Sequence, residues 1–477
     1  MEDAKLHRLP DTMLNFEILK PAAALAPRLG RLSVPGRTTL HTPHHIALTS
    51  RGVVPHLTQD VLKKHTGLNS FYVALEDFIE RAPKQTPPLF NIPCEPDESP
   101  MRRFASLQKD ALLVLGPRRT VPVTASATNT NTSISIHTAV GFHALASDYY
   151  ASAAQKLRPD IVIGLGDIMH GHTKPSAKRI DKMGDRTTAW MKDIVAAKGG
   201  LDKTKKGGRV YNVFAPILPI DKELQSWYLD ALTDDDEQLR PHLSGLALYD
   251  TASLAAIPDP LAALPRLALD NPASPQKLLH AVSLGMDLLT VPFVCQATDA
   301  GIVLDFEFPV KAPSSDASPA ERKALGIDCW MPQYATDLSP LTPGCECYAC
   351  TRHHRAYLRH LLAAKEMLGW VLIQVHNHHV IDLFFTGVRK SIENGTFEED
   401  RAAFERAYVD HLPEKTGQGP RLRGYQFTSS GPGEPKKNPS KYRMLDEGKQ
   451  ILAESITPGS NADATDLEAT GFAEVEK

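Results

Sequence analysis

The sequence has no long hydrophobic run, few cysteines and almost no net charge. No stretch reaches the roughly eighteen consecutive apolar residues that a transmembrane helix needs, so we expect no membrane span. The N-terminus, MEDAKLHRLPDTMLNFEILK, lacks the apolar core of a secretory signal, and we expect none there. Six cysteines among 477 residues are too few for a disulfide scaffold, which favours a reduced compartment.

The net charge of −3 would by itself argue against a nucleic-acid partner. The charge is unevenly distributed, however, because segment 445–477 holds eight acids and two lysines, a net of −6. The rest of the chain therefore carries +3, the difference between those two values. Basic stretches of this kind are more often solvated loops than contacts, but four of them are candidates for nucleic-acid binding: GPRRT (116–120), KPSAKR (174–179), KTKKGGR (203–209) and RLRG (421–424).

Three segments are poor in the residues that build a core. The tail 428–477 is rich in Pro, Gly, Ser and acids, so we expect it to be disordered. The inserts TASATNTNTSIS (124–135) and KAPSSDASPAERKA (311–324) are low in complexity, and we predict that both are surface loops.

Between these segments, short apolar runs alternate with helical patterns. Helices are predicted over 138–157, 184–197, 221–232 and 274–284, the last with Ser274 as N-cap and Pro275 in its first turn. Strands are predicted at 52–57, 71–75, 111–115, 160–165, 210–218, 243–248, 266–269 and 287–291. Eight such units predict an α/β fold, a (β/α)8 TIM-like barrel within 1–324, with a doubly wound sheet as the alternative.

After residue 325 the pattern changes to a cysteine-rich loop followed by two helices. We interpret 325–427 as an appended metal-binding subdomain with C-terminal helices. Cys345, Cys347 and Cys350 lie within six positions of each other. Thiolates on a tight turn are preferred zinc ligands, so this density favours metal binding over three unrelated reduced cysteines.

A structural zinc site needs a fourth ligand, and several histidines follow the cysteines. His353 and His354 come directly after the cluster and would have to bend back over their own loop. His376 lies about two turns into the second predicted helix, level with the loop if the helices form an antiparallel hairpin. Geometry therefore favours His376, then His354, and we expect His378 and His379 to face solvent or the interior nearby.

The spacing Cys-x-Cys-x2-Cys-x25-His, met by Cys345, Cys347, Cys350 and His376, resembles the zinc signature of the tRNA-guanine transglycosylases. The similarity continues before the cluster in DLSPLTPGCECYAC and after it in HNHHVIDLFFTGVR, which ends on Arg389. Over roughly 400 residues the chain is similar to this family, and the family's barrel agrees with the periodicity. The resemblance implies one structural Zn²⁺ per subunit, closed by four protein ligands.

In that family an aspartate attacks the ribose C1′ of a tRNA guanine, and queuine or a precursor replaces the base. The register of Gly285-Met286-Asp287 places this nucleophile at Thr290, a hydroxyl with no evident activating base. The proton-handling acid is missing from LLVLGPRRTVPV (112–123), and the base-reading aspartate and glutamine fall at Gly166 and near Leu218. The resemblance therefore implies that the chain has no catalytic residues.

Such combined losses resemble the non-catalytic branch of the family. The resemblance implies a subunit that is not an enzyme on its own and forms a heterodimer with a catalytic subunit. That complex would exchange guanine for queuine at the tRNA wobble position, a step of queuosine biosynthesis. It further implies tRNA as a partner, with Arg118 and Arg119 as candidate contacts. The implied localisation is the cytoplasm, with peripheral association with the mitochondrial outer membrane.

Two alternatives are open. The first is an active transglycosylase with a nucleophile relocated to Asp167, Asp287 or Asp328. We interpret Asp287 as a structural acid, Asp167 as a solvated loop acid and Asp328 as part of a strand leading into the cysteine loop, and relocation would require rebuilt near-attack geometry. The second is a zinc-dependent RNA-binding protein, which the apolar face of the helix after the cysteines disfavours.

Overall fold

The computed structural model describes residues 13–20, 25–82, 84–95, 98–124, 128–170, 175–199, 211–234, 239–311 and 322–420. The predicted tail 428–477 and the basic stretches 203–209 and 421–424 lie outside these residues. So does most of the predicted loop 311–324. All described residues fall within one compact unit, Met1–Gly433.

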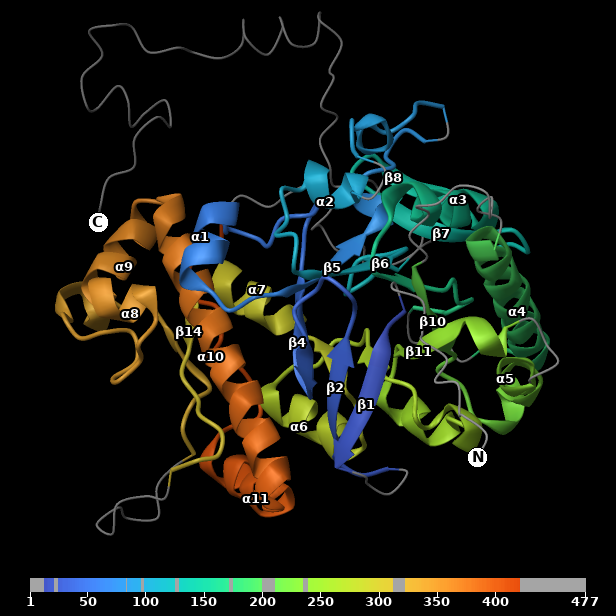
Figure 1. The fold of residues 1–477 in the computed structure, drawn as a ribbon. Coiled ribbons are helices and arrows are strands. Elements are labelled where there is room, and N and C mark those ends of the chain that lie inside the picture. The colour runs from blue at the N-terminus through green and yellow to red at the C-terminus, as the bar shows by residue number, and fades with distance from the viewer. Residues whose placement is uncertain are drawn as a thin grey trace, which may run out of the picture. The chain divides into compact units, whose positions relative to one another are not determined.

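Eight parallel strands close into a barrel, which confirms the predicted fold class (Figure 1). The strands follow one another around the ring in sequence order, and β13 returns to β4 with Thr290 beside Ile46. Most of their residues are apolar because both faces of such a sheet are covered. The barrel strands are β4 (His44–Leu48), β5 (Ser70–Ala74), β6 (Leu112–Gly116), β9 (Ile161–Ile163), β10 (Asn212–Ile217), β11 (Leu243–Leu248), β12 (Arg266–Ala268) and β13 (Leu288–Thr290).

Seven of the eight predicted strands coincide with barrel strands, but the prediction of 52–57 is wrong. That segment is a turn in which Gly52 has a φ of 81° and His56 a φ of 64°. These left-handed conformations do not occur in a strand. The first barrel strand lies earlier, at His44–Leu48, where two consecutive histidines break the apolar run.

The helices around the barrel largely follow their predicted positions, and Ser274 and Pro275 begin α6 as expected. The predicted helix 138–157 is wrong in its first half, because β7 (Ser133–Thr138) and β8 (Gly141–Ala146) form an antiparallel hairpin there. The same hairpin corrects the prediction that 124–135 is only a surface loop. The helices are α1 (Gln59–His65), α2 (Pro100–Phe104), α3 (Ser147–Leu157), α4 (Ala177–Gly199), α5 (Ser226–Thr233), α6 (Pro275–Ser283) and α7 (Pro292–Asp299).

An antiparallel sheet of three strands closes the amino-terminal end of the barrel: β1 (Asn15–Lys20), β2 (Leu29–Ser33) and β3 (Leu40–Thr42). Its buried side chains Leu32 and Leu40 join the barrel interior in one cluster with Val114 and Phe214. Figure 1 shows β1 and β2 side by side. This sheet does not cover the opposite, carboxyl-terminal end of the barrel.

The C-terminal elements are more helical than predicted, with four helices after the cysteine loop begins. The chain turns at Lys365, whose φ is 57°, and Gly369 lies inside the helix that follows. The elements are β14 (Ile302–Leu304), β15 (Gly326–Asp328), α8 (Tyr348–Arg352), α9 (Arg355–Ala363), α10 (Met367–Asn394) and α11 (Phe397–Ala407). α10 packs on α7, α9, β14 and the barrel strand β4.

Short 3-10 turns complete the connections: η1 (Leu75–Asp77), η2 (Pro88–Asn91), η3 (Glu223–Gln225), η4 (Arg240–His242), η5 (Thr251–Ala256), η6 (Asp259–Leu261) and η7 (Pro332–Thr336). Across the described ranges, none of the helices is both long and apolar enough to span a membrane. The subdomain division between 324 and 325 stays a prediction.

Candidate metal centre and barrel mouth

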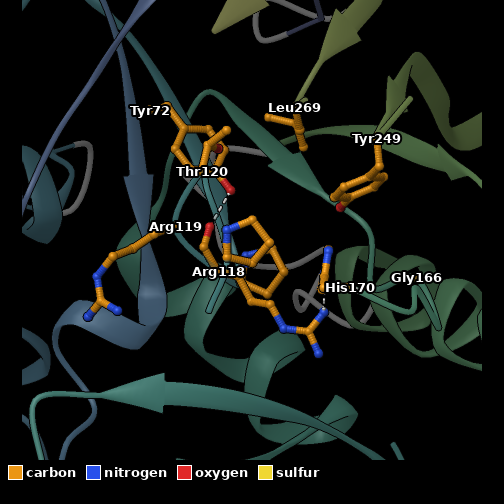
Figure 2. A pocket seen from close by; sticks show the side chains of 10 residues that line it. Tyr72, Arg118, Arg119, Thr120, Gly166, His170, Tyr249 and Leu269 are labelled. Carbon is orange, nitrogen blue, oxygen red and sulfur yellow. Dashed lines mark hydrogen bonds between the residues drawn. The ribbon is translucent and has the colours of Figure 1, made fainter. Parts of the chain in front are cut away.

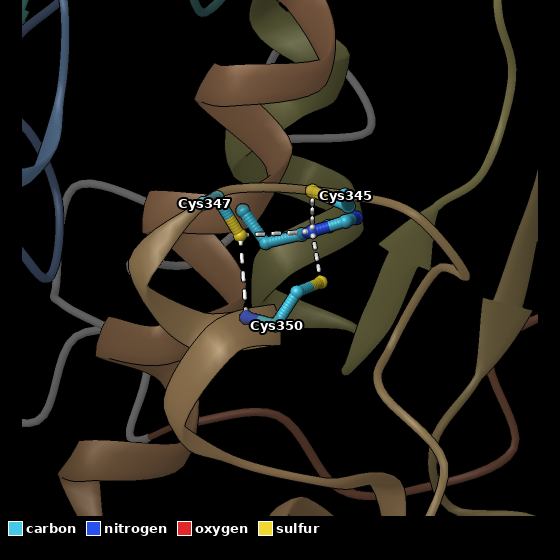
Figure 3. Close-up of side chains that lie close together, drawn as sticks. Cys345, Cys347 and Cys350 are labelled. Atoms are coloured by element: carbon cyan, nitrogen blue, oxygen red, sulfur yellow. Dashed lines mark hydrogen bonds between the residues drawn. The ribbon is translucent and has the colours of Figure 1, made fainter.

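Cys345, Cys347, Cys350 and His376 meet at one point, as their spacing predicts (Figure 3). Their four donor atoms all lie within 4.8 Å of one another, and the three sulfurs are 3.7, 3.4 and 3.3 Å from His376 Nδ1. In a tetrahedral zinc site, bond lengths of about 2.3 Å to sulfur and 2.0 Å to nitrogen place these atoms about 3.5 Å apart. The donor set therefore fits one four-coordinate metal ion.

The orientation of His376 is fixed from its far side. His376 Nε2 lies 2.9 Å from the carbonyl oxygen of Leu304 in β14. A carbonyl can only accept, so Nε2 carries the hydrogen and the Nδ1 lone pair faces the sulfurs. The ring is completely buried, and no solvent competes for that lone pair.

Without metal, the same contacts hold a proton at the centre. Burial lowers the pKa of His376, but the sulfurs of Cys345 and Cys350 outweigh it and raise the pKa to about 10. A metal ion must therefore displace protons as it binds. Affinity for metal is expected to rise with pH.

The cysteine loop is shaped by its own backbone. Gly344 adopts a φ of 76°, which allows the chain to turn immediately before Cys345. Cys347 then caps α8, and its sulfur accepts a hydrogen bond from the Cys350 backbone nitrogen at 3.4 Å. This arrangement explains the Cys-x2-Cys spacing, because the cap and the first helical turn present both sulfurs on one side.

The other candidate histidines lie outside the cluster. His354 caps α9, with its Nδ1 accepting from the Tyr357 backbone nitrogen at 3.2 Å. His353 stacks on the Tyr357 ring at 5.5 Å between centroids. His378 is buried beside Gln374, whose Nε2 is 3.0 Å from its Nε2. The structure thus brings His376 to the cysteines and leaves His354, the second choice, in a capping role.

At the carboxyl ends of the strands, where barrel enzymes place their active sites, the described residues line a narrow cavity (Figure 2). The cavity left there measures about 20 Å³, room for one or two water molecules. It is lined by Tyr72, Pro117, Arg118, Arg119, Thr120, Pro122, Gly166, His170, Tyr249 and Leu269. Gly166, at the position of the base-reading aspartate, is therefore at the mouth as predicted.

Arg118 occupies this mouth from the segment that should carry the proton-handling acid. Its Nη2 donates to the Ser135 carbonyl at 2.7 Å, and its Nη1 lies 3.2 Å from His170 Nε2. A guanidinium only donates, so His170 must accept with a neutral ring. Burial, followed by the charge of Arg118, lowers the pKa of His170 to about 3.

The role expected for Arg118 and Arg119 in tRNA binding finds no support in their contacts. The Arg118 guanidinium is turned to internal partners. Arg119 pairs with Asp77 at 2.6 Å and with Glu76 at 3.3 Å, and only 12% of its side chain is exposed. Both groups therefore hold the loop after β6 in place instead of facing a phosphate backbone.

Thr290 and Asp287 are both buried in structural contacts. Thr290 Oγ1 donates to the Ala268 carbonyl at 3.1 Å on the neighbouring strand. Asp287 accepts from Arg28 Nε and from the Arg266 backbone nitrogen, both at 2.8 Å. This agrees with the interpretation of Asp287 as a structural acid, because it ties the amino-terminal sheet to the start of β13.

The interpretation of Asp167 as a solvated loop acid is wrong. Its side chain is completely buried between two arginines of α4, with Arg186 Nη1 at 3.0 Å and Arg179 Nη2 at 2.5 Å. Asn129 Nδ2 adds a hydrogen bond at 2.7 Å. Asp328 ends β15 as predicted and accepts from the Trp330 backbone nitrogen at 3.0 Å. Strand β15 pairs with β14, outside the barrel.

Comparison with known proteins shows which family the chain matches. Residues 24–410 match the family model described as Queuine tRNA-ribosyltransferase. A protein of Schizosaccharomyces pombe named queuine tRNA-ribosyltransferase accessory subunit 2 is 36% identical over 390 residues, 81% of this chain and 83% of its own length. Proteins of the same name are 28% identical in Xenopus tropicalis and 24% in Gallus gallus. They align with 77% and 80% of this chain, and with 94% and 95% of their own lengths.

Proposed function

The chain belongs to the queuine tRNA-ribosyltransferase family, and from this premise we propose that it is the family's non-catalytic subunit. It dimerises with a catalytic subunit and helps to bind tRNA, while the partner exchanges guanine for queuine at the wobble position. One observation carries the proposal: the chain has a complete Cys3His cluster, whereas Arg118 occupies the mouth of its barrel.

Base exchange through a covalent intermediate requires a carboxylate held within reach of the ribose. The Thr290 hydroxyl already donates a hydrogen bond to the Ala268 backbone carbonyl. Asp167 and Asp287 are each held between arginine and backbone or amide donors. A cavity of about 20 Å³ is also far too small for a bicyclic base. These contacts argue against a relocated nucleophile.

The metal in this proposal is one structural Zn²⁺ per subunit, held by Cys345, Cys347, Cys350 and His376. Three thiolates and an imidazole are typical zinc ligands, and four protein ligands leave no open position for a substrate. The ion would supply no chemistry to the reaction. It would tie the cysteine loop to α10 and, through the Leu304 carbonyl, to β14.

The metal-bearing region is the surface that we propose for the catalytic partner. It exposes large apolar side chains, with Leu338 72% and Met367 53% accessible. Exposed apolar side chains on one region are typical of protein interfaces. The relatives named as accessory subunits suggest which protein covers it. The apolar set consists of Met331, Leu338, Tyr348, Met367 and Leu368.

The test is incorporation of labelled guanine into tRNA by the chain alone, by the catalytic subunit alone and by the two together. We expect background exchange from the lone chain and at least about a hundredfold more from the mixture. Robust exchange by the lone chain would contradict the proposal. If that exchange disappeared in Asp328→Ala, the relocated-nucleophile alternative would take its place.

We further propose that the protein works in the cytoplasm, with peripheral attachment to the mitochondrial outer membrane. Support for this comes from the family resemblance alone. Fractionation should recover the chain in the soluble fraction and, from mitochondria, in the supernatant of an alkaline carbonate wash. Retention in the carbonate pellet would contradict peripheral attachment.

A further inference from the structure

A second cavity lies at the opposite end of the barrel from the filled mouth. Its volume is about 280 Å³, against about 20 Å³ at the mouth. It opens between the amino-terminal ends of β4 and β5 and the C-terminal half of α10. Eight of the eleven lining residues have polar or charged side chains; the full lining is Thr39, Leu40, His41, His44, His45, Gly67, Asn69, Asp382, Phe385, Thr386 and Arg389.

Two of these side chains present groups without a hydrogen-bonding partner. His45 is 3% exposed, and its Nε2 finds no hydrogen bond in the described part of the chain. Asp382 Oδ1 is 3.6 Å from this nitrogen, too far for a hydrogen bond, so a neutral His45 ring that carries its hydrogen on Nδ1 presents an unused lone pair on Nε2. The His45 ring cannot swing closer, because it stacks on His44 and on Phe385, each at 5.5 Å between centroids. One ligand atom could contact His45 and Asp382 together.

Acceptors dominate this side of the cavity. Ser70 Oγ donates to the His45 carbonyl at 3.2 Å, so in its 3.0 Å contact with His44 it accepts from His44 Nε2. The hydrogen of His44 is thereby committed to Ser70. Asn69 Oδ1 is a buried acceptor for which the described residues supply no hydrogen bond. A ligand group at this wall must therefore bring hydrogens with it.

The cavity carries one fixed charge of each sign. Burial raises the pKa of Asp382 to about 6, so the carboxylate is mostly ionised at neutral pH. Burial lowers the pKa of His44 to about 3 and that of His45 below its usual range, so both rings are neutral. Arg389 is held by the Pro43 carbonyl and Thr386 Oγ1, both at 2.9 Å. These two contacts use two of its five N–H groups.

We propose that this cavity binds a small zwitterion of the α-amino acid class, with its ammonium group on Asp382 and His45 and its anionic group facing Arg389. A primary ammonium has three hydrogens, which match the Asp382 carboxylate, the His45 Nε2 lone pair and Asn69 Oδ1. The net charges of site and ligand are both zero. The inference does not depend on the proposed function, because the cavity lies at the other end of the barrel.

Other ligand classes fit less well. A simple anion would meet the Asp382 carboxylate, and a simple cation would meet Arg389, at a cost that a zwitterion avoids. A metal ion is disfavoured because, among the described residues, metal-type ligands gather only at the Cys3His centre. Asp382 and the neighbouring histidines do not form such a group.

The test is calorimetric, on the full chain with its metal bound. Each common L-amino acid is added separately at about 10 mM, with ethylamine and acetate as single-charge probes. We expect at least one amino acid to raise the midpoint of thermal unfolding by about 3 °C, and titration calorimetry then gives its affinity. Neither ethylamine nor acetate should match that shift.

Two comparisons decide the chemistry. N-acetylation of the best amino acid removes its ammonium group without any change to the protein, and should abolish binding. Asp382→Asn keeps the side-chain shape and should weaken binding at least about tenfold. The matched control Asp230→Asn removes an exposed helical acid on α5 and should leave binding unchanged. The proposal is overturned if no amino acid binds, if the acetylated form or a single-charge probe binds as well, or if Asp382→Asn binds normally.

Discussion

The metal centre and the barrel mouth are both buried and polar, but they differ in what their polar atoms do. At the metal centre, three sulfurs and one imidazole nitrogen converge on one point. At the mouth, every charged group considered above is matched, Arg118 by His170 and Ser135 and Asp167 by Arg179 and Arg186. Four metal-type donor atoms that converge on one point are typical of a metal site, whereas charged groups that pair with each other are typical of a structural cluster.

The strongest way to break this comparison is to remove a metal ligand. Cys350→Ser should abolish stoichiometric metal binding, because serine is a poor zinc ligand, and should cost several kcal/mol, on the order of 5, of the free energy of unfolding. Metal content by mass spectrometry and denaturant unfolding measure the two effects. Chelation of the wild-type chain should reproduce them.

The matched control is Cys94→Ser, outside the cluster, where the sulfur contacts only the Ile92 carbonyl at 3.4 Å in the described structure. It should change metal content by nothing measurable and stability by less than about 1 kcal/mol. Equal losses in Cys94→Ser and Cys350→Ser would contradict a metal site at the cluster.

A smaller effect is expected at the mouth from Asp167→Asn. The amide keeps the shape but leaves Arg179 and Arg186 without their shared negative charge, which should cost about 3 kcal/mol of the free energy of unfolding. Asp250→Asn is the matched control, because Asp250 is exposed and its capping contact with Ala252 survives in asparagine. A loss of similar size in both variants would show that burial of Asp167 carries no special weight.

The pH dependence of stability gives a further test of the barrel mouth, through His170. The pKa of His170 is lowered to about 3 in the folded chain, against about 6.5 when unfolded. Below pH 6.5 the unfolded chain binds a proton that the folded chain does not, so stability falls as pH decreases toward 3, by up to about 1.4 kcal/mol per pH unit. His170→Gln still accepts from Arg118 but cannot titrate, so it should lose less stability than wild type between pH 6 and 4.5. If both proteins lost the same amount of stability between pH 6 and 4.5, His170 would not be a buried neutral imidazole.

The smallest predicted effect concerns Thr290. Thr290→Val removes the hydrogen bond to the Ala268 carbonyl and should cost about 1 kcal/mol of the free energy of unfolding. Under the proposed function, exchange by the complex with the catalytic subunit should not change, because that subunit supplies the nucleophile. If guanine exchange fell by more than the loss of stability can explain, Thr290 would have a role in the reaction.

Features that depend on residues close together in the sequence could be predicted from the sequence. The cysteine loop and its histidine were found because a tight turn and a helix repeat fix their relative positions within the 32 residues from Cys345 to His376. Most barrel strands were found because both faces are buried, which makes them short apolar runs. The first strand was missed because His44 and His45 interrupt that pattern, and the His45 ring packs against His378 and Phe385 of α10, far away in the sequence.

Features made by distant partners were not predictable. Asp167 looked like a solvated loop acid because the two arginines that bury it come from α4, twelve and nineteen residues later. The sequence showed that the segment after β6 lacks the proton-handling acid, but it did not show what occupies that place in the fold. Only the fold shows that Arg118 turns inward across the strand ends to His170 and closes the mouth.

One measurement tests the division of labour most directly: labelled-guanine exchange by a complex whose catalytic subunit lacks its nucleophilic aspartate. If the barrel mouth of this chain is closed and only its scaffold and metal centre are retained, exchange should fall to background although the complex still forms and binds tRNA. Exchange that continues in that complex would mean that this chain supplies the chemistry, and would contradict the account.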